Sequence, residues 1–132
     1  MSEINLGIIG GGQLGSMLAI AAKKLNINTV IFCDDSDAPA QKFCNKFIYG
    51  NYDDVEKISE FINQVNLVTY EFENIPFETL NEINKLKNVL PKPSVNRLIQ
   101  HRLAEKDFIN KLNIRTTRYV SIEKKSDIDA LE

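Results

Sequence analysis

The spacing of apolar and polar residues along the chain predicts a series of short, buried β-strands. The first apolar run is nearly continuous and ends at three glycines, Gly10 to Gly12. Such a run is typical of a strand covered on both faces of a parallel sheet. Strands are expected at residues 4–9, 29–32, 47–49 and 67–70, with a further brief strand at 89–90. Pro91 and Pro93 should stop this last strand.

Apolar residues between the strands recur at helical spacing and predict amphipathic helices. The first helix is expected to bury one apolar stripe, formed by Leu14, Met17, Leu18, Ala21 and Leu25. Asn26 can end this helix in the left-handed conformation. Asp53 or Asp54 can cap a second helix over about residues 55–65, and a third is expected over 77–86.

The C-terminal third is the basic part of the chain and is predicted to be mostly helical. Ser94 can cap a long helix that reaches about residue 112, and Ser126 with Asp127 begins a further helix. In the part of the chain before this C-terminal third, strands and helices alternate, which predicts an α/β fold with a parallel, Rossmann-like sheet. We therefore expect a Rossmann-like domain over residues 1–92, followed by a helix and linker over 93–132.

Composition narrows the class of protein. The 132 residues are 43% hydrophobic and 26% charged, as in an ordinary globular domain, and the net charge of −2 gives no field that attracts nucleic acid or an anionic membrane. No apolar stretch approaches the roughly 20 residues of a membrane span, and the N-terminus lacks the basic start of a secretory signal, so a cytoplasmic location is expected. Cys33 and Cys44 are expected to be reduced thiols.

A glycine motif marks the first candidate site. Gly10, Gly12 and Gly15 form G-x-G-x-x-G between a predicted strand and helix, where backbone N–H groups can approach a phosphate. Asp34 follows the second strand, where dinucleotide enzymes place an acid on the ribose. An NAD(P)-binding Rossmann module therefore stays open as an alternative. A tight turn with nothing bound, or a domain that serves only assembly, stays open too.

Two further segments carry candidate chemistry. Glu71 and Glu73 follow the fourth strand in YEFENIP, at the edge where parallel sheets bind ligands. Carboxylates at alternate positions suit hydroxyl recognition, although they could equally be exposed loop acids. Arg102 could bind a phosphate through its planar fork or lie in solvent. His101, the single histidine, has no matched partner for catalysis or metal binding.

Four segments together resemble a known family. They are IIGGGQLGSMLAIAAKKLNI, DDSDAPA, YEFENIP and PSVNRLIQHRLAEKDFINKLNI. The chain is similar to the N-terminal, pre-ATP-grasp domain of 5-(carboxyamino)imidazole ribonucleotide synthases. The resemblance implies an ATP-dependent ligase of purine biosynthesis that uses ATP, Mg²⁺ and bicarbonate to carboxylate 5-aminoimidazole ribonucleotide, commonly as a homodimer.

The resemblance also implies roles for individual residues and leaves the catalytic residues unassigned. Arg102 would contact ATP, and the substrate-binding residues would be Gly12, Gln13, Leu14, Gly15 and Glu73. Three positions depart from the family pattern: Ser16 replaces a usual arginine, Asn26 a usual glycine and Arg115 a usual proline. The ATP-grasp domain and its Mg²⁺ ligands are expected beyond Glu132, so that residues 1–132 alone would be inactive.

Overall fold

The computed structural model describes residues 4–129, which divide by their contacts into two compact units. The division falls between Arg97 and Leu98. The first unit contains the sheet and the helices that cover it, and the second contains two short helices and an extended segment between them.

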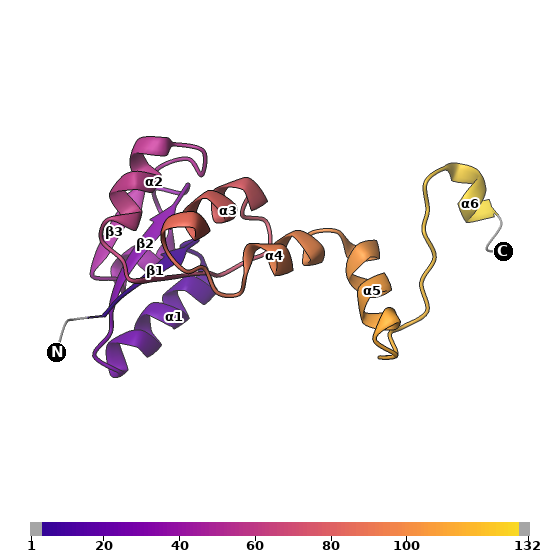
Figure 1. The fold of residues 1–132 in the computed structure, drawn as a ribbon, viewed down its shortest axis with the longest axis horizontal. Coiled ribbons are helices and arrows are strands. Elements are labelled where there is room, and N and C mark those ends of the chain that lie inside the picture. Colours follow the sequence, from indigo (N-terminus) through magenta and orange to yellow (C-terminus); the bar gives the residue numbers. More distant parts are fainter. Residues whose placement is uncertain (1–3, 130–132) are drawn as a thin grey trace. The chain divides into compact units, whose positions relative to one another are not determined.

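The core of the first unit is a four-stranded parallel sheet, which confirms the predicted α/β fold (Figure 1). Its strands are β1 (Asn5–Ile9), β2 (Asn28–Cys33), β3 (Lys46–Tyr49) and β4 (Leu67–Tyr70). The strand order is β3-β2-β1-β4, so the chain proceeds from β1 to one side of the sheet and later returns to the other. This reversal places a topological switch point between the carboxyl ends of β1 and β4.

Helices cover both faces of the sheet (Figure 1). They are α1 (Gln13–Lys24), α2 (Val55–Ile62) and α3 (Phe77–Leu86). Successive strand residues point to opposite faces: Ile8 packs in the cluster that includes Ala19 of α1, whereas Ile9 packs in the cluster that includes residues of α2 and α3. The sheet is therefore buried on both sides, which explains the continuous apolar runs.

Helix α1 buries a different face from the predicted one. Its large apolar residues are exposed, and the buried positions are Gly15, Ser16, Ala19 and Ala22. The helix lies very close to the strand ends, since a Cβ added at Gly15 would lie 2.8 Å from the carbonyl oxygen of Gly10. Only small side chains fit at such a distance, so the stripe of larger residues faces outward.

Two further predictions about the first unit are wrong. The connection from β2 to β3 contains only the short 3₁₀ helix η1 (Pro39–Lys42), so strands and helices do not alternate strictly. The expected strand at 89–90 is reduced to a single bridge between Val68 and Val89. Pro91 follows directly and has no N–H with which to extend the ladder.

Predicted helix ends are confirmed at two positions. Asn26 adopts φ 56°, the left-handed conformation that ends a helix. Asp54 caps α2, because its side-chain oxygen accepts a hydrogen bond of 3.0 Å from the amide of Lys57. Cys33 and Cys44 are free thiols.

The predicted long helix is two helices. They are α4 (Pro93–Ile99) and α5 (Arg102–Lys111), and a last short helix, α6 (Lys125–Asp129), begins next to the predicted Ser126. His101 is extended between α4 and α5, and its ring nitrogen Nδ1 accepts a hydrogen bond of 3.4 Å from the amide of Ala104. His101 thus acts as the N-cap of a new helix instead of continuing the first. No helix within residues 4–129 has the length and apolar character needed to cross a membrane.

Candidate functional site

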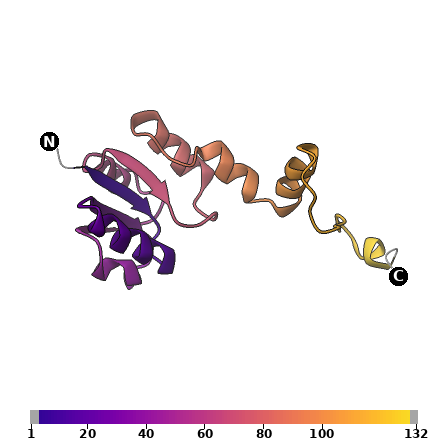
Figure 2. The ribbon, with the colours of Figure 1, turned by 90° about the horizontal axis from the view of Figure 1, so that it is seen from below.

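The candidate site lies at the switch point of the sheet, where two loops leave neighbouring strands. We call residues 10–15, after β1, the glycine loop and residues 71–74, after β4, the acidic loop. The two strands run side by side in the same direction (Figure 2). In their register, Ile9 lies opposite Tyr70. Both loops therefore start at the edge where open parallel sheets bind their ligands.

Glu71 joins the two loops. Its Oε1 accepts a hydrogen bond of 2.6 Å from the amide of Gly12, and its Oε2 accepts one of 2.5 Å from the amide of Gly15. Its own amide donates to the carbonyl of Ile9 at 3.1 Å. Hydrogen bonds from backbone N–H groups to a carboxylate are among the strong ones, and a negative charge is favoured at a helix N-terminus. The carboxylate of Glu71 thus occupies the position that an anion would take at the start of α1.

The glycines of the G-x-G-x-x-G motif make room for this carboxylate. A Cβ at Gly10 would lie 2.4 Å from Cγ of Glu71, and one at Gly12 would lie 2.8 Å from its Oε1. Gly10 also has φ 99°, a conformation that favours glycine. The motif is therefore explained by an interaction within the protein and does not by itself indicate a dinucleotide.

Other contacts hold the glycine loop from the opposite side. The amide of Ala40 donates to the carbonyl of Gly11 at 3.0 Å, and a Cβ at Gly11 would lie 2.7 Å from that of Ala38. These two buried alanines belong to the DAPA segment. Ser16, the departure from the family arginine, is buried, and its hydroxyl donates to the carbonyl of Gly12 at 2.9 Å. The position therefore supports the loop backbone and supplies no positive charge.

The predicted substrate-binding residues fall into two groups in this arrangement. Gly12, Gln13, Leu14 and Gly15 form the turn into α1, and Gln13 and Leu14 have exposed side chains. Glu73 is exposed in the acidic loop. The structure brings together Gly12, Gly15 and Glu71, and the part played by Glu71 was missed by sequence reasoning. Its position directly after the fourth strand, at the carboxyl edge of the predicted parallel sheet, is the signal that could have indicated it.

Asp34 is exposed at the end of β2 and lies beside a buried hydroxyl. The hydroxyl of Tyr52 donates to Sγ of Cys33 at 4.0 Å. Burial raises the pKa of Tyr52, and the neighbouring Cys33 and Asp34 raise it further. Tyr52 therefore remains a protonated, packed side chain at neutral pH.

Arg102 belongs to the second unit, at the start of α5. Its side chain is 75% exposed, and its Nη1 pairs with Oε2 of Glu105 at 2.5 Å. Arg102 lies on the wall of a hollow of about 410 Å³ that is also lined by Lys106 and Tyr119. The ammonium of Lys106 lies 5.3 Å from the centre of the Tyr119 ring. This hollow combines positive charge with an aromatic face.

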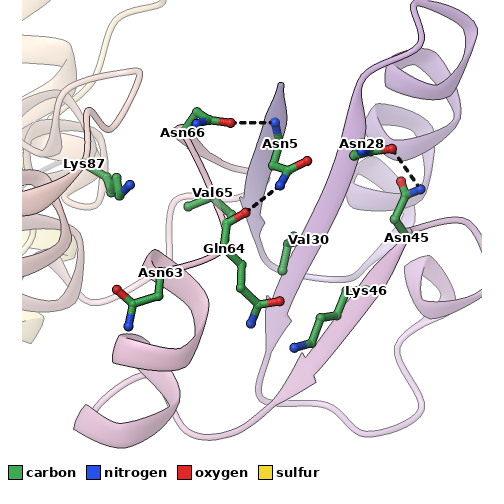
Figure 3. A pocket seen from close by; sticks show the side chains of 10 residues that line it. All are labelled: Asn5, Asn28, Val30, Asn45, Lys46, Asn63, Gln64, Val65, Asn66 and Lys87. Carbon is green, nitrogen blue, oxygen red and sulfur yellow. Dashed lines mark hydrogen bonds between the residues drawn. The ribbon is translucent and has the colours of Figure 1, made fainter. Parts of the chain in front are cut away.

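A polar pocket of about 440 Å³ lies at the opposite, amino-terminal edge of the sheet and is lined largely by amide side chains (Figure 3). These amides mostly satisfy one another or the strand ends. Asn66 accepts a hydrogen bond from the amide of Asn5 at 2.8 Å, and Asn45 donates to Asn28 at 3.2 Å. Because parallel sheets bind ligands at the carboxyl edge, this pocket is not our candidate. Within residues 4–129, no group of three or more His, Cys, Asp or Glu side chains is placed to hold a metal ion.

The chain is similar to known proteins over most of its length. Residues 1–100 match the model of a family described as the ribonucleotide synthetase preATP-grasp domain. A bifunctional purine synthesis protein of Dictyostelium discoideum is 41% identical over 93% of this chain, which covers 12% of that protein.

Two solved structures are also similar. N5-carboxyaminoimidazole synthetase from Staphylococcus aureus, complexed with ADP, is 31% identical with a TM-score of 0.88, over 97% of this chain and 34% of that one. The N5-carboxyaminoimidazole synthase of Aspergillus clavatus, in complex with ADP and 5-aminoimidazole ribonucleotide, is 26% identical with a TM-score of 0.77, over 88% of this chain and 31% of that one. The chain thus spans about a third of the length of these two solved chains. It spans a smaller share, 12%, of the longer Dictyostelium discoideum protein. Since the family match covers the entire sheet and both loops of the site, the chain belongs to the ribonucleotide synthetase pre-ATP-grasp domain family.

Proposed function

We propose that this chain is the N-terminal part of an ATP-dependent ligase that carboxylates 5-aminoimidazole ribonucleotide in purine biosynthesis. The observation that carries the proposal is the likeness to the Aspergillus clavatus enzyme, whose structure holds ADP and that ribonucleotide. In the proposed reaction, bicarbonate attacks the terminal phosphate of ATP to form carboxyphosphate and ADP. The exocyclic amine of the ribonucleotide then attacks the carboxyl carbon, and phosphate leaves.

The part proposed for this chain is to bind and orient the ribonucleotide. Gln13 and Leu14 lie in the first turn of α1, where backbone N–H groups have no partner within the helix. These amides and the Gln13 side chain can bind a polar ligand, whereas the amides of Gly12 and Gly15 already donate to Glu71. Because the two glycines have no side chain, their proposed contribution is to let the ligand come close to the backbone of the loop. Glu73, exposed in the acidic loop, can accept hydrogen bonds from ribose hydroxyls.

Arg102 is the proposed contact to ATP. Its guanidinium is exposed and can exchange its surface ion pair with Glu105 for a phosphate. The neighbouring Lys106 and Tyr119 make the same hollow suitable for an anionic, aromatic ligand. Within residues 4–129 no cluster of side chains could hold the Mg²⁺ that belongs to this proposal, and its positive charge would offset the negative charge of the phosphate groups. Bicarbonate as the carboxyl source, a homodimer and a cytoplasmic location belong to the same proposal.

The alternative, an NAD(P)-binding module, is disfavoured by Glu71. Its carboxylate already accepts the two amides that a pyrophosphate would need, and it would repel a second anion. Calorimetric titration of the complete protein with 5-aminoimidazole ribonucleotide, NAD and NADP tests both functions. We expect ribonucleotide binding, together with ADP release that depends on bicarbonate and ribonucleotide. Binding of NAD at micromolar concentration without any ribonucleotide binding would overturn the proposal.

A further inference from the structure

Glu71 differs from the other acidic residues of the candidate site because its carboxylate is turned into the protein. It is only partly exposed, and both oxygens accept backbone amides of a loop that is more than fifty residues away in sequence. Its amide is tied to Ile9 at the end of β1. Glu71 is thus held both by its backbone and by its side chain. Its partners are backbone groups of Ile9, Gly12 and Gly15, none of which has a side chain that is proposed to bind substrate.

We infer that Glu71 is a positioning residue for ribonucleotide binding, and this inference rests on the proposed function. Its carboxylate serves as a built-in anion that fixes the shape of the glycine loop. Gly12 and Gly15 stand on either side of Gln13 and Leu14, so the two oxygens of Glu71 hold both ends of the segment proposed to contact the ligand. Glu71 acts through this loop and does not itself bind the ribonucleotide.

Glu71 also couples the two loops of the site. It lies two residues before Glu73 in the acidic loop, while its side chain ends in the glycine loop. A shift of the acidic loop therefore changes the path of the glycine loop as well. The ribonucleotide contacts from the two loops are held in a single geometry, which is the condition for orienting the substrate amine.

A purely structural role is the rival explanation. Gly12 is the N-cap of α1 and provides no side-chain cap, and the first turn of α1 has no acidic residue. Glu71 supplies both a cap and a negative charge from another part of the chain. If this were its whole role, its loss would lower the melting temperature and leave the kinetic constants of the folded enzyme unchanged.

The test is Glu71→Gln in the complete enzyme. The glutamine has the same length but faces one glycine amide with its own NH₂ group, so one end of the loop loses its acceptor. Loss of one charge-assisted hydrogen bond at the loop corresponds to about a tenfold rise in KM for the ribonucleotide. We expect KM for ATP and kcat to change by less than about twofold, because no contact to ATP is altered. Asp53→Asn, at an exposed acid that follows β3, is the matched control and should change neither constant.

Glu71→Ala provides a second readout through rescue. It leaves two amides at the start of α1 without an acceptor, an arrangement that binds small anions. Added formate should lower the raised KM for the ribonucleotide in this variant part of the way to the wild-type value, and it should have no effect on the wild-type enzyme.

The outcomes separate the inference from the proposed function. A folded Glu71→Gln enzyme with a lower melting temperature and an unchanged ribonucleotide KM would overturn the positioning role. So would a folded Glu71→Ala enzyme that formate does not rescue. If the wild-type enzyme itself shows no ribonucleotide-dependent ADP release, the proposed function has failed, whatever the variants do.

Discussion

The side-chain amide of Asn96 donates a hydrogen bond of 2.9 Å to the carbonyl of Ile75, and both residues are fully buried. Asn96 lies on α4, and Ile75 follows the acidic loop directly. This bond attaches α4 to the end of the loop that carries Glu71 and Glu73. The polar side chain is therefore part of the framework behind the site.

The first prediction follows from this bond. Asn96→Ala removes this buried hydrogen bond and creates a small cavity at a fully buried position, so the free energy of unfolding should fall by about 1–3 kcal/mol. Urea unfolding followed by circular dichroism measures the change. Asn63→Ala, at an exposed position after α2, is the control and should change stability by less than about 0.5 kcal/mol. Equal effects of the two substitutions would show that the Asn96 bond does not stabilise the fold.

The second prediction concerns the glycine loop. Gly10→Ala forces a side chain onto a residue with φ 99° and against Cγ of Glu71. The free energy of unfolding should fall by about 1–3 kcal/mol or more. Gly50→Ala is the comparison, because its Cβ would also be crowded, at 2.7 Å from Cγ of Lys57, but Gly50 does not have the positive φ of Gly10. Denaturant midpoints should separate the two variants, and a Gly10→Ala protein as stable as Gly50→Ala would contradict the described loop geometry.

The third prediction tests the unexpected orientation of α1. Ala19 is fully buried and Met17 is 58% exposed, although the sequence pattern placed Met17 in the buried stripe. Ala19→Leu should overpack the space between helix and sheet and cost about 1–3 kcal/mol. Met17→Ser should change the free energy of unfolding by less than about 0.5 kcal/mol. Thermal unfolding of both variants measures the two losses of stability. A larger loss for Met17→Ser than for Ala19→Leu would show that α1 buries the face predicted from the sequence.

These cases show which parts of the fold a sequence can predict. The strands follow from local apolar runs, and the caps at Asn26 and Asp54 follow from residue type. The buried face of α1 does not, because it depends on how closely the glycine loop brings the helix to the sheet. Large apolar residues define the hydrophobic pattern, but small ones fill a narrow space.

The sequence predicts the candidate site only in part, again because some contacts depend on how distant segments pack. The residues of the glycine and acidic loops could be predicted from motifs, since both follow strands of a parallel sheet. The contact between Glu71 and the amides of Gly12 and Gly15 could not, because it joins residues 59 and 56 positions apart. The break before Arg102 was also missed, because a single extended residue, His101, interrupts an otherwise helical pattern.

The fourth prediction is a dependence of stability on alkaline pH. Burial, with Cys33 and Asp34, raises the pKa of the Tyr52 hydroxyl above its ordinary value in the folded protein. The unfolded chain therefore loses this proton first, at about pH 10, and the stabilising contribution of Tyr52 is present below that pH and is lost above it.

Urea midpoints measured between pH 8 and 11 test this effect. Tyr52→Phe keeps the edge-to-face packing on Phe32, whose ring centre is 5.5 Å away, and removes the titrating hydroxyl. Its stability should fall less steeply above pH 10 than that of the wild type. Tyr49→Phe, at an exposed position, should follow the wild type. Parallel curves for wild type and Tyr52→Phe would show that another group causes the alkaline loss.

The last prediction separates the two ligands of the proposed reaction. Glu73→Gln in the complete enzyme removes the charge from a proposed contact to ribose hydroxyls, and a hydrogen bond to a charged group is worth about 1.5–3 kcal/mol. Ribonucleotide use should therefore weaken by about tenfold to a hundredfold, while KM for ATP barely moves. Arg102→Ala should do the opposite, raising KM for ATP and leaving ribonucleotide binding nearly intact, because its exposed guanidinium is the proposed phosphate contact. Steady-state kinetics with each substrate varied in turn measures both effects. If both substitutions changed KM for ATP alone, or neither changed any constant in a folded enzyme, the roles proposed for Glu73 and Arg102 would be wrong even though the family is correct.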